Sequence, residues 1–265
     1  MTARQLAWRA CYELLAARVT RPEWAFMNYG YAPLEPGDPP LVLDPADESD
    51  RFCIQLYRHT VGESPLEGKD VLEVGCGRGG GASYVARYLR PRTMTGLDFS
   101  TMAIAHCVRH RQAPGLRFVH GDAQSMPFAD QSFDAVVNIE SSHCYGDMDR
   151  FLAEVHRVLR PGGALLWADL RDRGERLDTV LRQFDSCALE LAQQRDVTPE
   201  VLHALSLDNA RKVALIEAWF PRVVHPLIRP FAGLEGTRNY VRMATGDIRY
   251  RSARLLKAAP TAATT

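Results

Sequence analysis

The chain has 265 residues, of which 46% are hydrophobic and 24% are charged, a composition typical of a soluble globular protein. Basic and acidic residues number 32 each, so the formal net charge is zero. This balance gives no indication of a nucleic-acid partner or of binding to an anionic membrane, and the length suits one large domain or one domain with a small cap.

Residues 1–62 are predicted to form N-terminal helices and a covering strap. Apolar residues recur at helical spacing within 3–19, and a second helical pattern covers 47–62. Between them, the proline-rich segment 28–46 is typical of an irregular strap rather than of a linker between two domains.

From residue 70 onward, strand patterns alternate with helical patterns. The predicted strands cover 71–74, 93–97, 117–120, 133–139 and 164–169, and the predicted helices cover 80–89, 102–111 and 149–159. Such alternation predicts an α/β fold with right-handed crossovers and a mostly parallel sheet with helices on both faces. Residues 63–170 are therefore assigned to the core of the domain.

Residues 171–257 are predicted to complete the domain and to cover its site. The pattern predicts helices at 176–184 and 201–220, strands at 189–197 and 248–256, and a mixed covering segment at 221–245. The last strand is expected to run antiparallel to its neighbour, which gives a seven-stranded sheet with a C-terminal helical cap. Residues 258–265 are small and polar, which predicts a disordered tail.

The most informative stretch is 71–77, which reads Val-Leu-Glu-Val-Gly-Cys-Gly. An apolar run with Glu73 just before a Gly-x-Gly turn predicts a buried strand whose glycines let the backbone approach a ligand closely. A carboxylate here suits a positively charged ligand and suits a pyrophosphate poorly, because two anions would meet in a cleft. We therefore expect Glu73, Gly75, Cys76 and Gly77 to bind a cofactor.

Three further strand ends carry polar residues at the edge where open α/β sheets bind ligands. Asp98 ends the second predicted strand, where a carboxylate accepts hydrogen bonds from ribose hydroxyls, and Phe99 is expected to flank an adenine. Asp122, followed by Ala123, ends the third strand and is expected to accept from the adenine amino group. Asn138 lies at the end of the fourth strand, near the reacting part of the cofactor.

These motifs resemble, in the same order, those of the class I S-adenosylmethionine-dependent methyltransferases. The resemblance covers about residues 65–170 and includes Asp122-Ala123-Gln124-Ser125-Met126-Pro127-Phe128, Ser132-Phe133-Asp134 and Leu159-Arg160-Pro161-Gly162-Gly163. It implies a Rossmann-like fold and S-adenosylmethionine as cofactor, whose sulfonium and ammonium suit the charge of Glu73. The Gly-x-Gly-x-x-Gly pattern with Asp98 also matches a dinucleotide fingerprint, so an NAD(P)-dependent oxidoreductase stays open as an alternative.

The segment after the fourth predicted strand is the best placed for the chemistry of the acceptor. His143 is the predicted general base, because an imidazole takes up a proton near neutral pH. Glu140 is expected to orient His143 or to act as a base itself, and Tyr145 to line the substrate pocket. Arg78, in the glycine loop, is expected to be a solvated residue.

The outer segments resemble the phthiotriol and phenolphthiotriol dimycocerosate methyltransferases and other natural-product methyltransferases. The residues that carry this resemblance are Met27-Asn28-Tyr29-Gly30-Tyr31, Ile139-Glu140-Ser141-Ser142-His143-Cys144-Tyr145 and Thr245-Gly246-Asp247-Ile248-Arg249-Tyr250. It implies a small lipophilic or polyketide-like acceptor that is methylated on a hydroxyl. We expect Tyr29 to close over the cofactor, and Tyr31 and Trp219 to contact the acceptor.

The sequence therefore predicts a small-molecule O-methyltransferase that works by direct displacement, and an N- or C-methyltransferase on the same scaffold stays open. The six cysteines form no Cys-x-x-Cys pair and no cluster with zinc-ligand spacing, which favours a reduced cytoplasmic protein without a bound metal. We expect no nucleic-acid partner and no membrane span, and a homodimer stays open.

Overall fold

The computed structural model describes residues 21–35, 41–62 and 64–259. The predicted helix at 3–19 lies outside these residues, and so does most of the predicted tail at 258–265.

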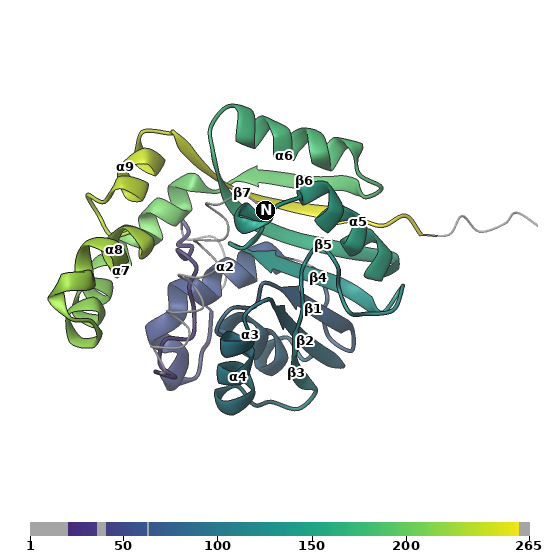
Figure 1. Cartoon of the computed structure of the whole chain (residues 1–265), viewed down its shortest axis with the longest axis horizontal. Coiled ribbons are helices and arrows are strands. Elements are labelled where there is room, and N and C mark those ends of the chain that lie inside the picture. The colour runs from purple at the N-terminus through teal and green to yellow at the C-terminus, as the bar shows by residue number, and fades with distance from the viewer. Residues whose placement is uncertain (1–20, 36–40, 63, 260–265) are drawn as a thin grey trace, which may run out of the picture.

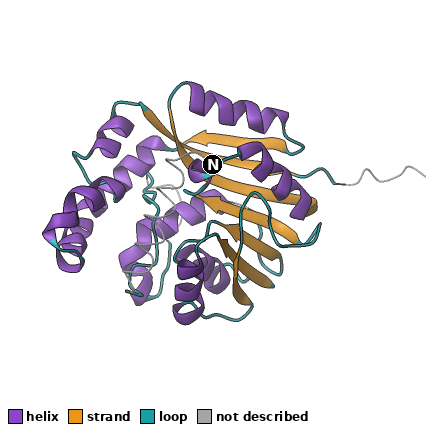
Figure 2. Cartoon of the chain, in the orientation of Figure 1, coloured by secondary structure: helices purple, strands orange, loops and turns teal. Residues whose placement is uncertain are grey.

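One seven-stranded sheet forms the centre of the molecule (Figures 1 and 2). Its strands are β1 (Asp70–Val74), β2 (Thr93–Asp98), β3 (Leu116–His120), β4 (Phe133–Ile139), β5 (Leu159–Asp172), β6 (Glu190–Asp196) and β7 (Ile248–Leu256). They lie in the order β3-β2-β1-β4-β5-β7-β6. Among these strands, β7 alone runs in the opposite direction to the other six. The predicted seven-stranded, mostly parallel sheet is thus confirmed. The chain order reverses between β1 and β4, the place where such sheets bind ligands.

Helices cover both faces of this sheet (Figure 2). The α-helices are α2 (Arg51–Val61), α3 (Gly80–Tyr88), α4 (Thr101–His110), α5 (Met148–Val158), α6 (Glu175–Ser186), α7 (Thr198–Trp219), α8 (His225–Phe231) and α9 (Arg238–Ala244), and the 3-10 helices are η1 (Pro45–Asp50), η2 (Ser142–Cys144) and η3 (Arg222–Val224). Apolar side chains of α2, α3 and α7 pack on one face of the sheet, and those of α5 and α6 pack on the other.

Strand β1 illustrates how the sequence directs side chains to the two layers. All its residues are buried, and successive side chains of a strand point to opposite faces. Val71 joins the apolar cluster on the α2 side, and Leu72 and Val74 join the cluster on the α5 side. By the same alternation Glu73 points toward α2, where it meets Tyr57.

Some boundaries differ from the predicted ones for physical reasons. β5 begins at Leu159 rather than at 164, because the Pro-Gly-Gly turn itself pairs with the residue after β7: Gly162 N donates to Lys257 O, and Lys257 N donates to Gly163 O, both at 2.9 Å. The helical pattern at 47–62 is a short 3-10 helix, η1, followed by α2. The mixed segment 221–245 contains η3, α8 and α9, which form a lobe with α7 beside the sheet (Figure 1).

A glycine at position 81 is required by the packing of α2 on α3. A Cβ atom added at Gly81 would overlap the phenol ring of Tyr57. We expect Gly81→Ala to lower the unfolding free energy by about 1–3 kcal/mol, because overpacking forces side chains and backbone to shift. Urea denaturation measures this. In a Tyr57→Ala background the same substitution should cost less, and equal costs in both backgrounds would rule out this contact as the cause.

Candidate active site

The carboxyl ends of β1 and β2 meet at the glycine turn. Gly75, Gly77 and Gly79 all have positive φ, a conformation that residues with a side chain rarely adopt. The Asp98 carboxylate accepts from Gly77 N at 2.9 Å through Oδ2 and from Ser100 N at 2.9 Å through Oδ1. The structure therefore brings Asp98 against the predicted cofactor loop.

Glu73 lies directly under this loop and is fully buried. Its Oε1 accepts from the Tyr57 hydroxyl at 2.5 Å, and its Oε2 makes no hydrogen bond within the described residues. Burial raises the pKa of the Glu73 carboxyl to about 8, against the opposing effects of Tyr57 and the Ala82 amide. A carboxylate in this position gains from any ligand that brings a positive charge or a hydrogen-bond donor.

The residues after β3 form a compact turn beside the end of β2. Asp122 Oδ1 accepts from the backbone N of Gln124 at 2.9 Å, and Ala123 is buried. Phe99 is half-buried, and its carbonyl lies 3.0 Å from Nε2 of His120. These residues therefore lie on neighbouring strand ends, at the edge where the glycine turn also lies.

A second polar group lies where β4 ends beside β1. The Asn138 amide nitrogen lies 2.9 Å from Val74 O, 2.8 Å from Ser141 Oγ and 3.0 Å from the Tyr145 hydroxyl. The Asn138 Oδ1 atom is buried and has no hydrogen-bond partner in the described part of the chain. Ser141 and Tyr145 also pack against Gly75, where a Cβ would overlap Ser141.

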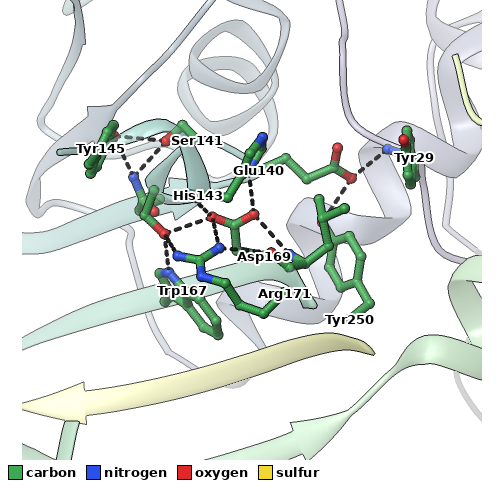
Figure 3. A network of polar contacts seen from close by, with 12 residues as sticks. Tyr29, Glu140, Ser141, His143, Tyr145, Trp167, Asp169, Arg171 and Tyr250 are labelled. Atoms are coloured by element: carbon green, nitrogen blue, oxygen red, sulfur yellow. Dashed lines mark hydrogen bonds and ion pairs between the residues drawn. The ribbon is translucent and has the colours of Figure 1, made fainter. Parts of the chain in front are cut away.

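His143 is paired with Asp169, at the end of β5 (Figure 3). Nδ1 of His143 lies 2.7 Å from Asp169 Oδ1, and the backbone N of His143 donates to Oδ2 at 2.9 Å. Asp169 is fully buried and is also held by Ser142 Oγ at 2.6 Å and by the Arg171 guanidinium at 2.9 Å. Partial burial opposes protonation of His143, but the Asp169 charge outweighs it and raises the His143 pKa well above its usual value.

The pairing of Glu140 with His143 that the sequence suggested is not what the structure contains. Glu140 Oε1 instead accepts from the backbone N of Tyr29 at 2.6 Å and from the Tyr250 hydroxyl at 2.9 Å (Figure 3). Burial raises the pKa of the Glu140 carboxyl to about 7. The reason for the difference is register: Asp169 on β5 lies beside the turn after β4, whereas Glu140 faces the strap.

Residues 21–31, called the strap from here on, are held by Glu140 at Tyr29 and by Arg78 at Arg21 and Trp24. The Arg78 guanidinium donates to Trp24 O at 2.5 Å and to Arg21 O at 2.8 Å, and it lies over the Trp24 ring. Arg78 is buried, so the expectation of a solvated loop residue is wrong. Tyr31 is also buried, with its ring stacked on His59 at 4.4 Å between centroids.

An apolar pocket of about 90 Å³ lies between this strap and the α7–α8 lobe. Its wall includes Tyr29 and Trp219, two of the predicted contact residues, but neither Tyr31 nor Tyr145. Other apolar and aromatic residues around it are Trp24, Phe26, Met27, Leu215, Ile216, Phe220, Ile228 and Phe231. Tyr29 belongs both to this wall and, through its backbone, to the Glu140 contact.

Sequence reasoning missed Tyr57, Arg78, Asp169 and Tyr250 as parts of this arrangement. Asp169 carried a usable signal, because it follows the apolar run 164–168 in much the same way as Asp98 follows Leu97. Tyr57 and Tyr250 carried no such signal, since a tyrosine within an apolar pattern is normally predicted to be a core residue.

The strand order, and the polar groups gathered at one edge of the sheet, define a Rossmann-like enzyme that binds a nucleoside-containing cofactor. Residues 72–167 match the family model described as a methyltransferase domain. The phthiotriol/phenolphthiotriol dimycocerosates methyltransferase of Mycobacterium leprae is 40% identical over 246 residues, which cover 92% of this chain and 89% of that protein. The fatty-acid O-methyltransferase of Mycolicibacterium smegmatis is 41% identical over 251 residues, 93% of this chain and 88% of that protein.

Solved structures agree on the fold. The geranyl diphosphate C-methyltransferase of Streptomyces coelicolor, in complex with S-adenosyl-L-homocysteine, has a TM-score of 0.61 at 16% identity and covers 93% of this chain and 98% of that one. This chain belongs to the class I S-adenosylmethionine-dependent methyltransferases, in the family of the phthiotriol/phenolphthiotriol dimycocerosates methyltransferases. Its cofactor is S-adenosylmethionine, so the alternative of an NAD(P)-dependent oxidoreductase is dropped.

Neither a membrane-spanning helix nor a metal-binding cluster is found in the described ranges. Every helix there is too short or too polar to cross a bilayer. No group of three or more histidine, cysteine, aspartate or glutamate side chains within those ranges is arranged to hold a metal ion.

The buried charge of Glu73 predicts a pH-dependent stability of the cofactor-free protein. Its folded pKa, about 8, lies above its ordinary value of 4.5, so stability present below pH 4.5 is lost as the pH rises to about 8. We expect Glu73→Gln to become progressively more stable than wild type across this window, by at most about 1.4 kcal/mol per pH unit. Urea denaturation at several pH values measures the difference.

Glu154→Gln is the matched control, because Arg157 holds the pKa of Glu154 below its ordinary value. Its stability difference from wild type should have the opposite sign. A Glu73→Gln difference that does not change with pH would contradict a raised pKa at Glu73.

Proposed function

We propose that this enzyme transfers a methyl group from S-adenosylmethionine to a hydroxyl of a small lipophilic or polyketide-like molecule, with His143 as general base. The observation that carries the proposal is the pair formed by His143, in η2 after β4, and Asp169, within β5, with Nδ1 held at 2.7 Å from a buried carboxylate. The printed names of the relatives, which describe methylation of phthiotriols and fatty acids, support a lipophilic acceptor.

Two buried oxygens support the assignment of the cofactor residues. Glu73 Oε2 and Asn138 Oδ1 lack hydrogen-bond partners within the described chain, and buried acceptors of this kind are normally satisfied. We assign Glu73 to the cofactor ammonium, Asp98 to the ribose hydroxyls, and Asn138 to the region of the methyl donor. The remaining proposed contacts are Tyr29, Gly75, Cys76, Gly77, Phe99, Asp122 and Ala123.

When bound, the cofactor supplies an electrophilic methyl group on a sulfonium. The chain has to align the acceptor and remove its proton. Asp169 is a positioning residue: it accepts from Nδ1–H, which leaves Nε2 as the ring atom that takes the proton. The His143 side chain is 36% exposed, so an acceptor hydroxyl can reach Nε2.

The pocket beside the strap is proposed to hold the apolar part of the acceptor. The aromatic and aliphatic residues of its wall suit a hydrocarbon chain. Trp219 is assigned to this role. The lining also contains the charged residues Glu23, Asp50, Arg211 and Lys212. Tyr145 is assigned to the reacting end, against Gly75, and Tyr31, which belongs to the strap, stacks on His59 of α2. Glu140 is reassigned from partner of His143 to the group that holds Tyr29 in place.

A carboxylate acceptor is a second candidate. A histidine whose pKa Asp169 raises well above its usual value can remain protonated and then pairs with an anion. A carboxylate needs no base, and one relative is named a fatty-acid O-methyltransferase. N- and C-methylation are further alternatives on the same scaffold, without an observation that favours them.

Cofactor binding is tested by isothermal titration of S-adenosylmethionine and S-adenosylhomocysteine. We expect Asp98→Ala to weaken both by about 1.5–3 kcal/mol, the loss typical of hydrogen bonds to a charged group. Asp178→Ala, which removes an exposed carboxylate on α6, is the matched control and should bind as wild type does. Equal affinities for Asp98→Ala and wild type would remove Asp98 from the cofactor site.

The general base is tested by kinetics with a hydroxyl acceptor. We expect His143→Ala to lower kcat by about 10²–10⁴, the usual contribution of a general base, and added imidazole to restore part of it. Asp169→Asn should cause a smaller loss and move the acidic limb of the pH–rate profile to lower pH, because the charge that raises the His143 pKa is gone.

The affinity for the cofactor should be unchanged in His143→Ala and in Asp169→Asn. His156→Ala, on α5, is the matched control and should have the wild-type rate. The pH profile separates the two acceptors. With a hydroxyl the wild-type rate rises as His143 loses its proton, whereas with a carboxylate it falls. A wild-type rate in His143→Ala would exclude both roles.

A further inference from the structure

The outer end of the α7–α8 lobe presents apolar side chains to solvent. This tip patch consists of Pro221, Val223, Pro226 and Leu227, all of which are exposed. The Val223 and Leu227 side chains are 84% and 65% exposed, values that place them among the most exposed large apolar residues of the described chain. They lie four residues apart, across the junction of η3 and α8, so they project from one helical turn.

The charged side chain within the span of the tip patch is Arg222. Between positions 221 and 227 the ionisable residues are Arg222 and His225, and none is acidic. Arg229, further along α8, is paired with Glu217 at 3.4 Å. Arg222 is exposed beside Val223.

The inner side of the same helix belongs to the apolar pocket. Phe220, Ile228 and Phe231 line the pocket, and the tip patch lies on the same segment of chain. The lobe lies at one side of the molecule, away from β2 and β3 (Figure 1). A molecule at the surface of the tip therefore has apolar side chains on its way toward the pocket.

We propose that the tip patch docks on the surface of an anionic lipid bilayer, from which the acceptor enters the pocket. This rests on the proposed lipophilic acceptor. A bilayer interface accepts a few exposed aliphatic side chains together with arginines that face anionic headgroups. A lipophilic acceptor partitions into the same interface, so docking shortens its path to the pocket without passage through water.

The size of the tip patch favours a bilayer over a second copy of the chain. A stable protein interface buries about 800 Å² on each partner, far more than four side chains of this size present. The tip also carries Arg222, and two copies related by a twofold axis would bring two such positive charges together. A lipid surface demands no matched shape and supplies the opposite charge.

Co-sedimentation with vesicles, without cofactor or acceptor, tests the docking separately from the methyltransferase reaction. The probes are vesicles of phosphatidylcholine alone and of phosphatidylcholine with phosphatidylglycerol. We expect wild type to bind the anionic vesicles more tightly and to release at high salt. Val223→Asp with Leu227→Asp should weaken binding about tenfold or more, because it removes apolar burial and adds negative charge.

Val42→Asp with Leu207→Asp is the matched control, since these side chains are 83% and 55% exposed but lie outside the tip. It should bind as wild type does. The proposal would be overturned if the wild-type protein did not bind anionic vesicles, or if both double variants lost the same amount of vesicle binding. A tip variant that becomes a smaller species in gel filtration would overturn it in favour of a dimer interface.

Discussion

The buried charge of Asp169 is the constraint on which the reactive end of this site depends. A carboxylate removed from water is stable only when hydrogen bonds and opposite charge surround it. Ser142, His143 and Arg171 together meet that need, and two of them lie in the short helix η2 directly after β4. The turn into η2 begins at Glu140 with a φ of 46°, a conformation that is costly for a residue with a side chain. The arrangement that satisfies Asp169 thus also fixes where His143 points.

The strap joins this reactive end to the cofactor loop. Arg78 holds the strap from the glycine loop after β1, and Glu140 holds it from the end of β4. A Cβ at Gly80 would lie 2.6 Å from the carbonyl oxygen of Ala25, so the loop and the strap are in direct backbone contact. The same strap forms one wall of the apolar pocket, so the glycine loop, the strap and the pocket wall are packed together.

The sheet could be predicted from the sequence because its information is local. A few neighbouring residues are enough to predict the apolar strands β1 to β5 and the glycine turn. The same holds for the acids that follow two of these strands, Asp98 and Asp122. The partners across the site could not be predicted in the same way. That His143 meets Asp169 and not Glu140 depends on the register of β4 with β5, in which Ile139 pairs with Ala168. That Arg78 is buried depends on a strap about 50 residues earlier in the chain. Neither register nor strap placement has a local pattern.

The same edge of the sheet brings several acidic side chains together before any ligand is considered. Burial raises the pKa of Glu73 to about 8 and that of Glu140 to about 7, and the neighbouring charges of Asp98 and Asp169 add to the effect at each. The empty fold therefore loses stability as these groups ionise, since an anion is costly in a low-dielectric site. A cation that binds there recovers that cost, so the site gains affinity for a positively charged cofactor at the expense of the apo state. A neutral or anionic analogue of the same shape recovers none of it. S-adenosylhomocysteine keeps the ammonium that Glu73 is proposed to bind, so this contact would contribute to the affinity for the cofactor and for its product alike.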